Sequence, residues 1–237
     1  FRDSALSPNH PVTRGTAQND DIYFQTREAS NKYYNNIVGV VEKYMAKMSE
    51  LTGRKHGLFN YYGDENAKNI IIAMGSVTET IEETIDYLNA KGGSYGLVKV
   101  HLYRPFSNKH LLEAIPASAE RICVLDRTKE PGSTGEPLYL DVRNAFFDVE
   151  NAPMIIGGRY GLGSKDVTPT DIKTVFDNLT SEKPKNNFTL GIVDDVTNTS
   201  LEKSESIKIA HPGTVRCKFW GLGSDGTVGA NKQAIKI

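Results

Sequence analysis

The chain has 237 residues, of which 38% are hydrophobic and 24% are charged. These values are typical of a globular protein with one large or two small domains, and they exclude a disordered tail. The 28 basic and 29 acidic residues leave a net charge of −1, so the charge balance favours neither nucleic acid nor an anionic membrane as a partner.

The first 64 residues predict a loop followed by one long helix. Residues 1–24 are rich in Pro, Asn, Asp, Thr and Gly without apolar periodicity, which indicates a surface loop. From about Thr26 to Leu51 the apolar residues keep helical spacing, and Gly53 predicts the end of that helix. The next stretch, KHGLFNYYGDENAKN, mixes aromatic and polar residues, so we expect a linker there and a domain boundary near Asp64.

The middle of the chain alternates between short apolar runs and amphipathic segments. Buried strands joined by helices require a mainly parallel sheet with helices on both faces, because right-handed crossovers place helices on each side. The sequence therefore predicts a three-layer α/β sandwich. Its five strands are expected in residues 69–76, 95–103, 120–126, 153–158 and 187–193, and its four helices in residues 77–93, 104–115, 135–147 and 168–180.

The last part of the chain predicts a connector and the opening of another unit. Residues 194–212 are polar and charged without a core pattern, so a second boundary is expected there. TVRCKFW (214–220) predicts a strand, followed by a glycine turn and a helix that starts near Val228. Because the chain starts at Phe1 without a Met and stops at Ile237, we expect it to be a piece of a longer protein.

Cysteine and histidine give little support for a disulfide or metal site. The two cysteines, Cys123 and Cys217, stand in apolar contexts, which is typical of free thiols that behave as small buried hydrophobes. This favours a reduced, cytoplasmic compartment. The five histidines are scattered without ligand spacing, so no metal site is expected within the chain. No run approaches the roughly 20 apolar residues of a membrane-spanning helix.

Five cations follow the predicted strands at the edge where open parallel sheets bind ligands. Two interpretations stay open for this group. The cations can hold an anion or a facing acidic surface, or they can be solvated loop charges that pair with a neighbouring domain. The second is the more common case for loop charges, so we assign them no catalytic role. The five are Arg104, Arg127, Lys129, Arg159 and Lys165.

Two glycine runs repeat one pattern, YGLGSKD (160–166) and WGLGSDG (220–226). Glycines let the backbone take positive φ and approach a bulky anion closely, and a following helix N-terminus favours phosphate. A tight turn alone is the favoured explanation for the first run. The second run also has Ser224, Thr227 and Lys232, so a pyrophosphate site is nearly as well supported as a bare turn. Neither run has the Walker lysine spacing.

Long stretches of the chain resemble the pyruvate:ferredoxin (flavodoxin) oxidoreductase family. The stretches are HPVTRGTAQNDDIYFQTREASN, LFNYYG, IIAMGSVTETIEE, GLVKVHLYRPFS, VLDRTKEPGSTGEPLYLDV, GGRYGLGSKD, GIVDDVT and KFWGLGSDGTVGANKQAIKI. The resemblance runs from end to end, while chains of that family are several times longer. It implies that residues 1–64 are the tail of a thiamine-pyrimidine domain with a linker helix. It further implies that residues 65–195 are a transketolase C-terminal-like domain and that residues 196–237 begin a coenzyme A-binding domain.

The resemblance also implies a reaction and its cofactors. The family decarboxylates pyruvate oxidatively to acetyl-CoA and CO2, and its electrons pass through 4Fe-4S clusters to ferredoxin or flavodoxin. Thiamine diphosphate, Mg and the clusters would be bound outside this chain, so we expect no catalytic residue here and an inactive fragment. The positions that the resemblance gives as coenzyme A contacts are Gly221, Leu222, Gly223, Ser224 and Asp225, together with Gly226 and Thr227.

The partners implied by the resemblance are the remaining domains, a second copy in a homodimer, and ferredoxin or flavodoxin. Two alternatives stay open, a free-standing coenzyme A or nucleotide-binding module and a non-catalytic subunit of a split 2-oxoacid oxidoreductase. Faces that pack on other domains would be exposed in this chain. We therefore expect apolar patches around Phe24, Tyr33, Tyr34 and Trp220 that promote self-association.

Overall fold

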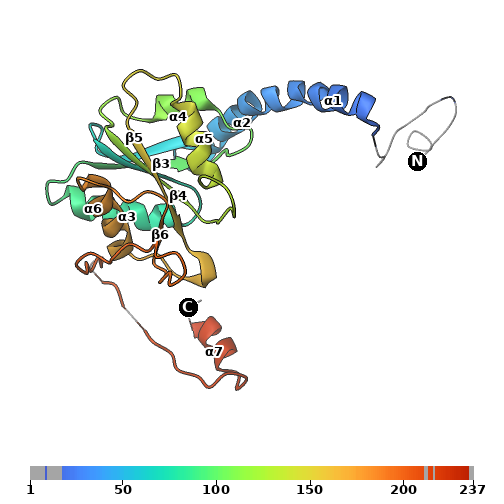
Figure 1. The fold of residues 1–237 in the computed structure, drawn as a ribbon. Coiled ribbons are helices and arrows are strands. Elements are labelled where there is room, and N and C mark those ends of the chain that lie inside the picture. The colour runs from blue at the N-terminus through green and yellow to red at the C-terminus, as the bar shows by residue number, and fades with distance from the viewer. Residues whose placement is uncertain (1–8, 10–17, 211–212, 216, 235–237) are drawn as a thin grey trace.

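A six-stranded sheet forms the centre of the molecule in the computed structural model (Figure 1). The structure describes residues 9, 18–210, 213–215 and 217–234. The strand order is β1-β3-β2-β4-β5-β6, with β1 antiparallel to β3 and all other pairs parallel. The strands are β1 (Phe59–Gly63), β2 (Asn69–Ala73), β3 (Tyr95–Val100), β4 (Arg121–Asp126), β5 (Met154–Tyr160) and β6 (Phe188–Leu190).

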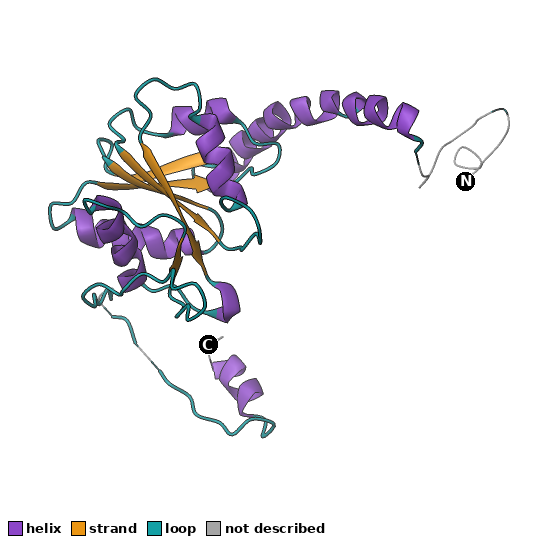
Figure 2. Cartoon of the chain, viewed as in Figure 1, coloured by secondary structure: helices purple, strands orange, loops and turns teal. Residues whose placement is uncertain are grey.

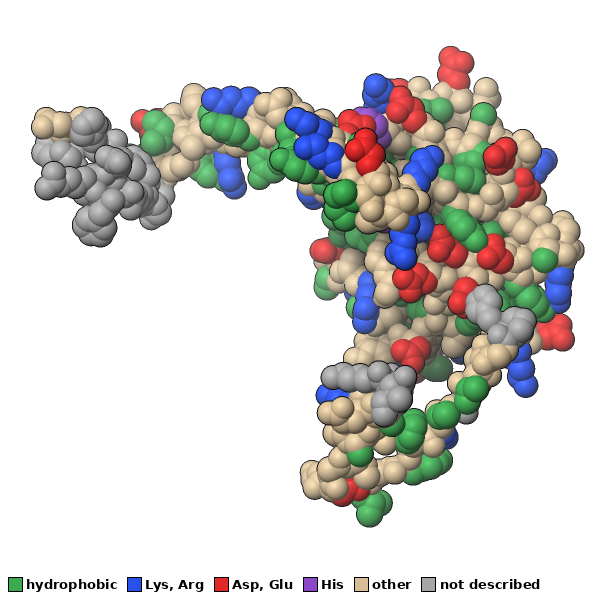
Figure 3. Space-filling model, turned by 180° about the vertical axis from the view of Figure 1, so that it is seen from behind, with side chains coloured by type: hydrophobic (Ala, Val, Ile, Leu, Met, Phe, Trp, Pro, Cys, Tyr) green, Lys and Arg blue, Asp and Glu red, His purple; other side chains and the backbone are tan. Residues whose placement is uncertain are grey.

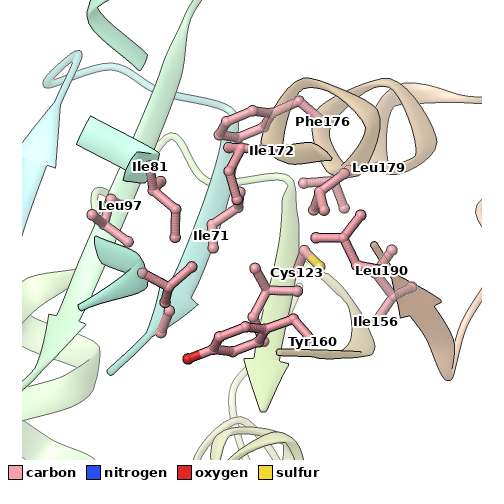
Figure 4. Close-up of a cluster of buried hydrophobic side chains, with 14 of the residues drawn as sticks. Ile71, Ile81, Leu97, Cys123, Ile156, Tyr160, Ile172, Phe176, Leu179 and Leu190 are labelled. Atoms are coloured by element: carbon pink, nitrogen blue, oxygen red, sulfur yellow. The ribbon is translucent and has the colours of Figure 1, made fainter. Parts of the chain in front are cut away.

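Helices cover both faces of the sheet, which confirms the predicted three-layer α/β fold (Figure 2). One face packs against α3 (Val77–Asn89) and α6 (Pro169–Thr180). The other packs against α4 (Asn108–Ala114) and α5 (Pro137–Ala145). Alternate residues of each strand enter opposite cores, as the period of two requires. Figure 4 shows part of the first core, where α6 lies over the central strands.

The sheet has one strand more than the five expected. The stretch that we interpreted as a linker, LFNYYG, contains β1, whose Phe59 pairs with Val100 of β3. Four of its five residues are half-buried, because an edge strand has one neighbour and no helix covers all of it. The sheet therefore already begins at Phe59, before the boundary expected near Asp64. The three domain divisions themselves remain predictions.

Two consecutive helices form an arm that projects from the sheet (Figure 1). α2 (Asn31–Thr52) confirms the helix expected from about Thr26, and Gly53 ends it with a φ of 68°. α1 (Asp20–Ala29) begins before Thr26, so residues 20–24, which were expected to be loop, are helical and that part of the prediction was wrong. Its first turn carries Asp20 and Asp21, and carboxylates there stabilise a helix through its dipole. The rest of the expected loop, apart from residue 18, Asn19 and Asn9, lies outside the described residues.

The connector after β6 packs along α6 as an extended segment. The Ser204 N–H donates to Thr174 Oγ1 at 3.0 Å, and Lys203 Nζ lies 3.2 Å from Asp171 Oδ1. The strand expected in TVRCKFW is absent from the described residues 213–215 and 217–222. A strand needs a neighbouring strand for its ladder of backbone hydrogen bonds, and none of the six strands pairs with these residues. The helix expected near Val228 is present as α7 (Thr227–Ala234).

Candidate functional site

The predicted coenzyme A contacts lie in one exposed loop that leads into α7. Residues 221–226 are exposed, and Thr227 is half-buried. Gly223 and Gly226 both have a φ of 81°, and Ser224 has a φ of 53°. The left-handed backbone that the glycines suggested is therefore present, and it curls the loop tightly before the helix.

The carboxylate of Asp225 accepts hydrogen bonds from groups at the start of α7. It accepts the Thr227 N–H at 3.0 Å, the Leu222 N–H at 3.3 Å and the Thr227 hydroxyl. These hydrogen bonds, led by that from the Thr227 side chain, hold the Asp225 pKa below its usual range. A phosphate group would have to use other donors of the loop, because this carboxylate already takes two of its N–H groups. The coenzyme A contacts remain a prediction.

The first glycine run has a similar backbone in another part of the molecule. Residues Leu162–Ser164 form a short 3-10 turn after β5, and Ser164 has a φ of 54°, close to that of Ser224. Gly161 has a φ of 68°, and a Cβ placed there would lie 3.0 Å from Nε of Arg127. This glycine therefore has a steric role, since it lets the Arg127 side chain lie against the backbone.

A cleft lies at the carboxyl edge of the sheet between β2 and β4. The connection after β2 leads to β3 on one side, and the connection after β4 leads to β5 on the other side. The two connections therefore diverge between β2 and β4. Open α/β sheets bind ligands at such switch points. Two adjoining cavities of about 430 and 320 Å³ share Ser76, Arg127 and Tyr160. The larger is also lined by Met74, Gly75, Tyr103, Leu125, Asp126, Thr128 and Pro137, and the smaller by Val77, Thr80, Gly161, Lys165, Asp166 and Val167.

The floor of this cleft is built from buried groups that hold the strand ends together. Tyr160 comes from β5 and donates its hydroxyl to the Met74 carbonyl, after β2, at 3.3 Å; its ring lies at the strand ends in Figure 4. The buried Asp126 carboxylate accepts the N–H groups of Leu138 and Tyr139 at 3.0 and 3.1 Å, which caps α5. Burial is the main cause of a raised pKa at Asp126 and at Tyr160.

The five strand-end cations do not form one cluster. Arg104 pairs with Asp141 at 2.8 Å, and the buried Arg159 lies 3.5 Å from Glu136. Lys129 Nζ donates to the Glu130 carbonyl at 3.1 Å. Arg127 and Lys165 form no ion pair with any carboxylate of the described residues, and both line the smaller cavity. Two of the five are therefore ion-paired, Lys129 contacts only a carbonyl, and Arg127 and Lys165 lie at the cleft.

The described residues contain no group of side chains arranged to bind a metal ion, and one of the two cysteines is buried. No group of three His, Cys, Asp or Glu side chains there is arranged to hold a metal ion. Cys123 is fully buried in the core, and burial raises its pKa. Cys217 is exposed, which differs from the burial expected from its apolar neighbours, because the predicted strand around it is not formed.

None of the helices in residues 18–210 and 217–234 is long and apolar enough to cross a membrane.

Comparison with known proteins shows strong similarity over the whole chain. Residues 67–172 match the family model of pyruvate:ferredoxin oxidoreductase core domain II. The chain is 63% identical to a pyruvate-flavodoxin oxidoreductase of Enterobacter agglomerans and 57% identical to a pyruvate:ferredoxin oxidoreductase of Moorella thermoacetica. Each alignment covers 100% of this chain and 20% of the relative, so the chain spans about a fifth of the length of these relatives.

One solved structure shows a weaker likeness. It is described as 2-oxoglutarate:ferredoxin oxidoreductase from Magnetococcus marinus with 2-oxoglutarate, coenzyme A and succinyl-CoA bound. The superposition has a TM-score of 0.34 at 18% identity and covers 51% of this chain and 19% of that chain. A likeness this weak does not bear on the site.

Proposed function

The chain belongs to the pyruvate:ferredoxin (flavodoxin) oxidoreductase family, and from this premise we propose that it is one segment of an enzyme that oxidatively decarboxylates pyruvate. The products are acetyl-CoA and CO2, and ferredoxin or flavodoxin receives the electrons. Within that enzyme, this segment acts as a structural module between domains and contributes a coenzyme A-binding loop.

The iron-sulfur clusters of such an enzyme do not fit the two cysteines of this chain. An iron-sulfur cluster is held by four cysteine thiolates, whereas this chain has two cysteines, one of them buried with a raised pKa. The described residues also bring together no group of acidic side chains for a diphosphate-bound magnesium ion. We therefore assign no reaction step to this segment.

The observation that supports a module between domains is the apolar surface of the arm. Neither α1 nor α2 has a buried residue, and Figure 3 shows apolar side chains distributed along the arm. Helices gain most of their stability from packing an apolar face, so this surface fits a neighbouring domain or subunit. The large exposed apolar side chains of the arm are Ile22, Tyr23, Phe24, Tyr33, Tyr34, Val40, Tyr44, Met48 and Leu51.

The arm is expected to make the isolated chain self-associate. Phe24, Tyr33 and Tyr34 are 66%, 65% and 54% exposed, and exposed aromatic surface of this kind associates to leave water. Replacing all three by serine should lower the average mass measured by sedimentation velocity at high protein concentration. The matched control is Phe147→Ser, which removes an 84% exposed aromatic at the end of α5. A chain that stays monomeric at every concentration would contradict this expectation.

Support for the coenzyme A loop comes from its backbone and its position. The positive φ angles of Gly223, Ser224 and Gly226 bring the backbone to the surface ahead of α7, and Lys232 adds a cation on that helix. The Asp225 carboxylate holds the turn through Leu222 and Thr227. We propose that the phosphates of coenzyme A contact the exposed backbone between residues 223 and 226, while Asp225 keeps that backbone in shape.

Calorimetric titration of the chain with coenzyme A tests this role. We expect binding that weakens roughly tenfold in Asp225→Asn and in Ser224→Ala, because a hydrogen bond to a charged group contributes about 1.5–3 kcal/mol. Ser164→Ala is the matched control, since Ser164 holds the same place in the first glycine run and has almost the same φ. Binding that responds equally to Ser164→Ala, or no binding at all, would remove the loop from the proposal.

A further inference from the structure

The cleft between β2 and β4 combines a polar cavity with a more apolar one. The smaller cavity, about 320 Å³, presents the Ser76 and Thr80 side chains together with Arg127 and Lys165. The larger, about 430 Å³, presents Met74, Leu125 and Pro137. Cavities of about 300–1,000 Å³ are the size that holds cofactor-sized molecules, and such pockets combine apolar walls with a few polar groups. The two cavities meet at Arg127.

We propose that this cleft is a binding site for a small organic phosphate of mononucleotide type, separate from the glycine loop. The phosphate lies in the smaller cavity against Arg127 and Lys165. The base and sugar lie in the larger cavity, against the wall formed by Met74, Leu125 and Pro137. This site would be a property of the central domain and is independent of the proposed coenzyme A loop.

The charge of the site comes from Arg127 and Lys165, which both line the smaller cavity. The other strand-end arginines are already neutralised, Arg104 by Asp141 and Arg159 by Glu136. By contrast, Arg127 and Lys165 pair with no carboxylate of the described residues. A guanidinium binds phosphate oxygens in a bidentate way, which makes Arg127 the main anchor.

One side of the exposed Arg127 side chain packs against Gly161. Its Nε would lie 3.0 Å from a Cβ at Gly161, so the side chain rests against a residue that has none. Arg127 lines both cavities. It therefore lies between the proposed position of the phosphate and that of the base and sugar.

Two carboxylates, Asp126 and Asp166, also line the cleft, and they affect the binding of an anion differently. Asp126 is buried and already accepts the N–H groups of Leu138 and Tyr139 at the start of α5. Its charge is therefore directed into the protein. Asp166 is exposed at the rim of the smaller cavity, beside Lys165 in sequence. The site thus discriminates against ligands of high negative charge and favours a single phosphate group.

Calorimetric titration of the full 237-residue chain with AMP, inorganic phosphate and adenosine tests the site. We expect AMP to bind more tightly than either part, because only AMP fills both cavities. Arg127→Gln should weaken AMP binding roughly ten- to hundredfold, as expected for loss of a hydrogen bond between charged groups. Lys165→Gln should weaken it less, since a lysine makes a single point contact.

The matched control is Lys129→Gln, which removes an exposed cation after β4 that lines neither cavity. It should leave AMP affinity unchanged, as should Ser224→Ala in the glycine loop. Thermal unfolding of each variant checks that it folds. Absence of AMP binding, or binding that falls with Ser224→Ala and not with Arg127→Gln, would overturn the site in the cleft. Coenzyme A binding that does not respond to Ser224→Ala would overturn the loop and leave this site intact.

Discussion

Replacing Phe176 by alanine is expected to lower the free energy of unfolding by about 3–5 kcal/mol. The Phe176 side chain is fully buried between α6 and the sheet, and its ring lies 4.4 Å from that of Tyr95. Alanine removes the aromatic contacts and leaves a cavity that the close-packed core cannot fill completely. Because a domain is stabilised by about 5–15 kcal/mol in total, this loss is a large fraction. Urea denaturation followed by circular dichroism measures it.

Phe147→Ala is the matched control for this prediction. The Phe147 side chain is 84% exposed just after α5, so its truncation removes little packing. Its effect should stay within about 0.5 kcal/mol, the range of most surface substitutions. Equal effects of the two substitutions would mean that α6 does not pack on the sheet as described.

Replacing Gly158 by alanine is expected to destabilise the fold by about 1–3 kcal/mol, the range typical of overpacking. Gly158 lies in β5 and pairs with Phe188 of β6. A Cβ at this position would lie 2.2 Å from Cζ and 2.3 Å from Cε2 of the Phe188 ring, which is fully buried. The ring has no empty space to enter, so it must shift and disturb its own neighbours. Chemical denaturation again gives the free energy of unfolding.

A second substitution isolates the cause of this loss. Phe188→Leu in the Gly158→Ala background shortens the side chain that meets the new methyl group. The double variant should be more stable than the sum of the two single effects predicts, which a double-mutant cycle measures. Gly39→Ala is the control, because nothing lies within 4 Å of a Cβ there and alanine favours the interior of α2. Simple additivity at Gly158 and Phe188 would contradict the steric explanation.

The sequence predicted most of the central sheet and its helices because the relevant signals are local. Apolar runs such as NIIIA and RICVLD place successive side chains on both faces of a strand, and both became strands buried on each side. The helices after them followed the apolar spacing of residues such as Ile81 and Ile85. The period of a strand or a helix relates residues that are two to four positions apart, so it can be recognised from the sequence alone.

Elements that depend on distant partners were predicted less well. The edge strand β1 has mixed polar and aromatic residues, and only its pairing with β3, more than thirty residues later, makes it a strand. TVRCKFW has a strand-like composition, but its described residues, 214–215 and 217–220, form no strand and are exposed. A strand is stabilised by its neighbours rather than by its own sequence alone.

The same division holds for the sites. The glycine runs, their positive φ and the helix start near Val228 were determined by the sequence, because glycine conformation is a local property. Only the tertiary structure decided which of the strand-end cations form ion pairs and which lie at the cleft. It paired Arg104 with Asp141 and Arg159 with Glu136, and it left Arg127 and Lys165, 38 residues apart in sequence, at one cavity. The physical reason is that ion pairing and cavity shape arise from contacts between distant segments, which the parallel sheet brings to a single edge.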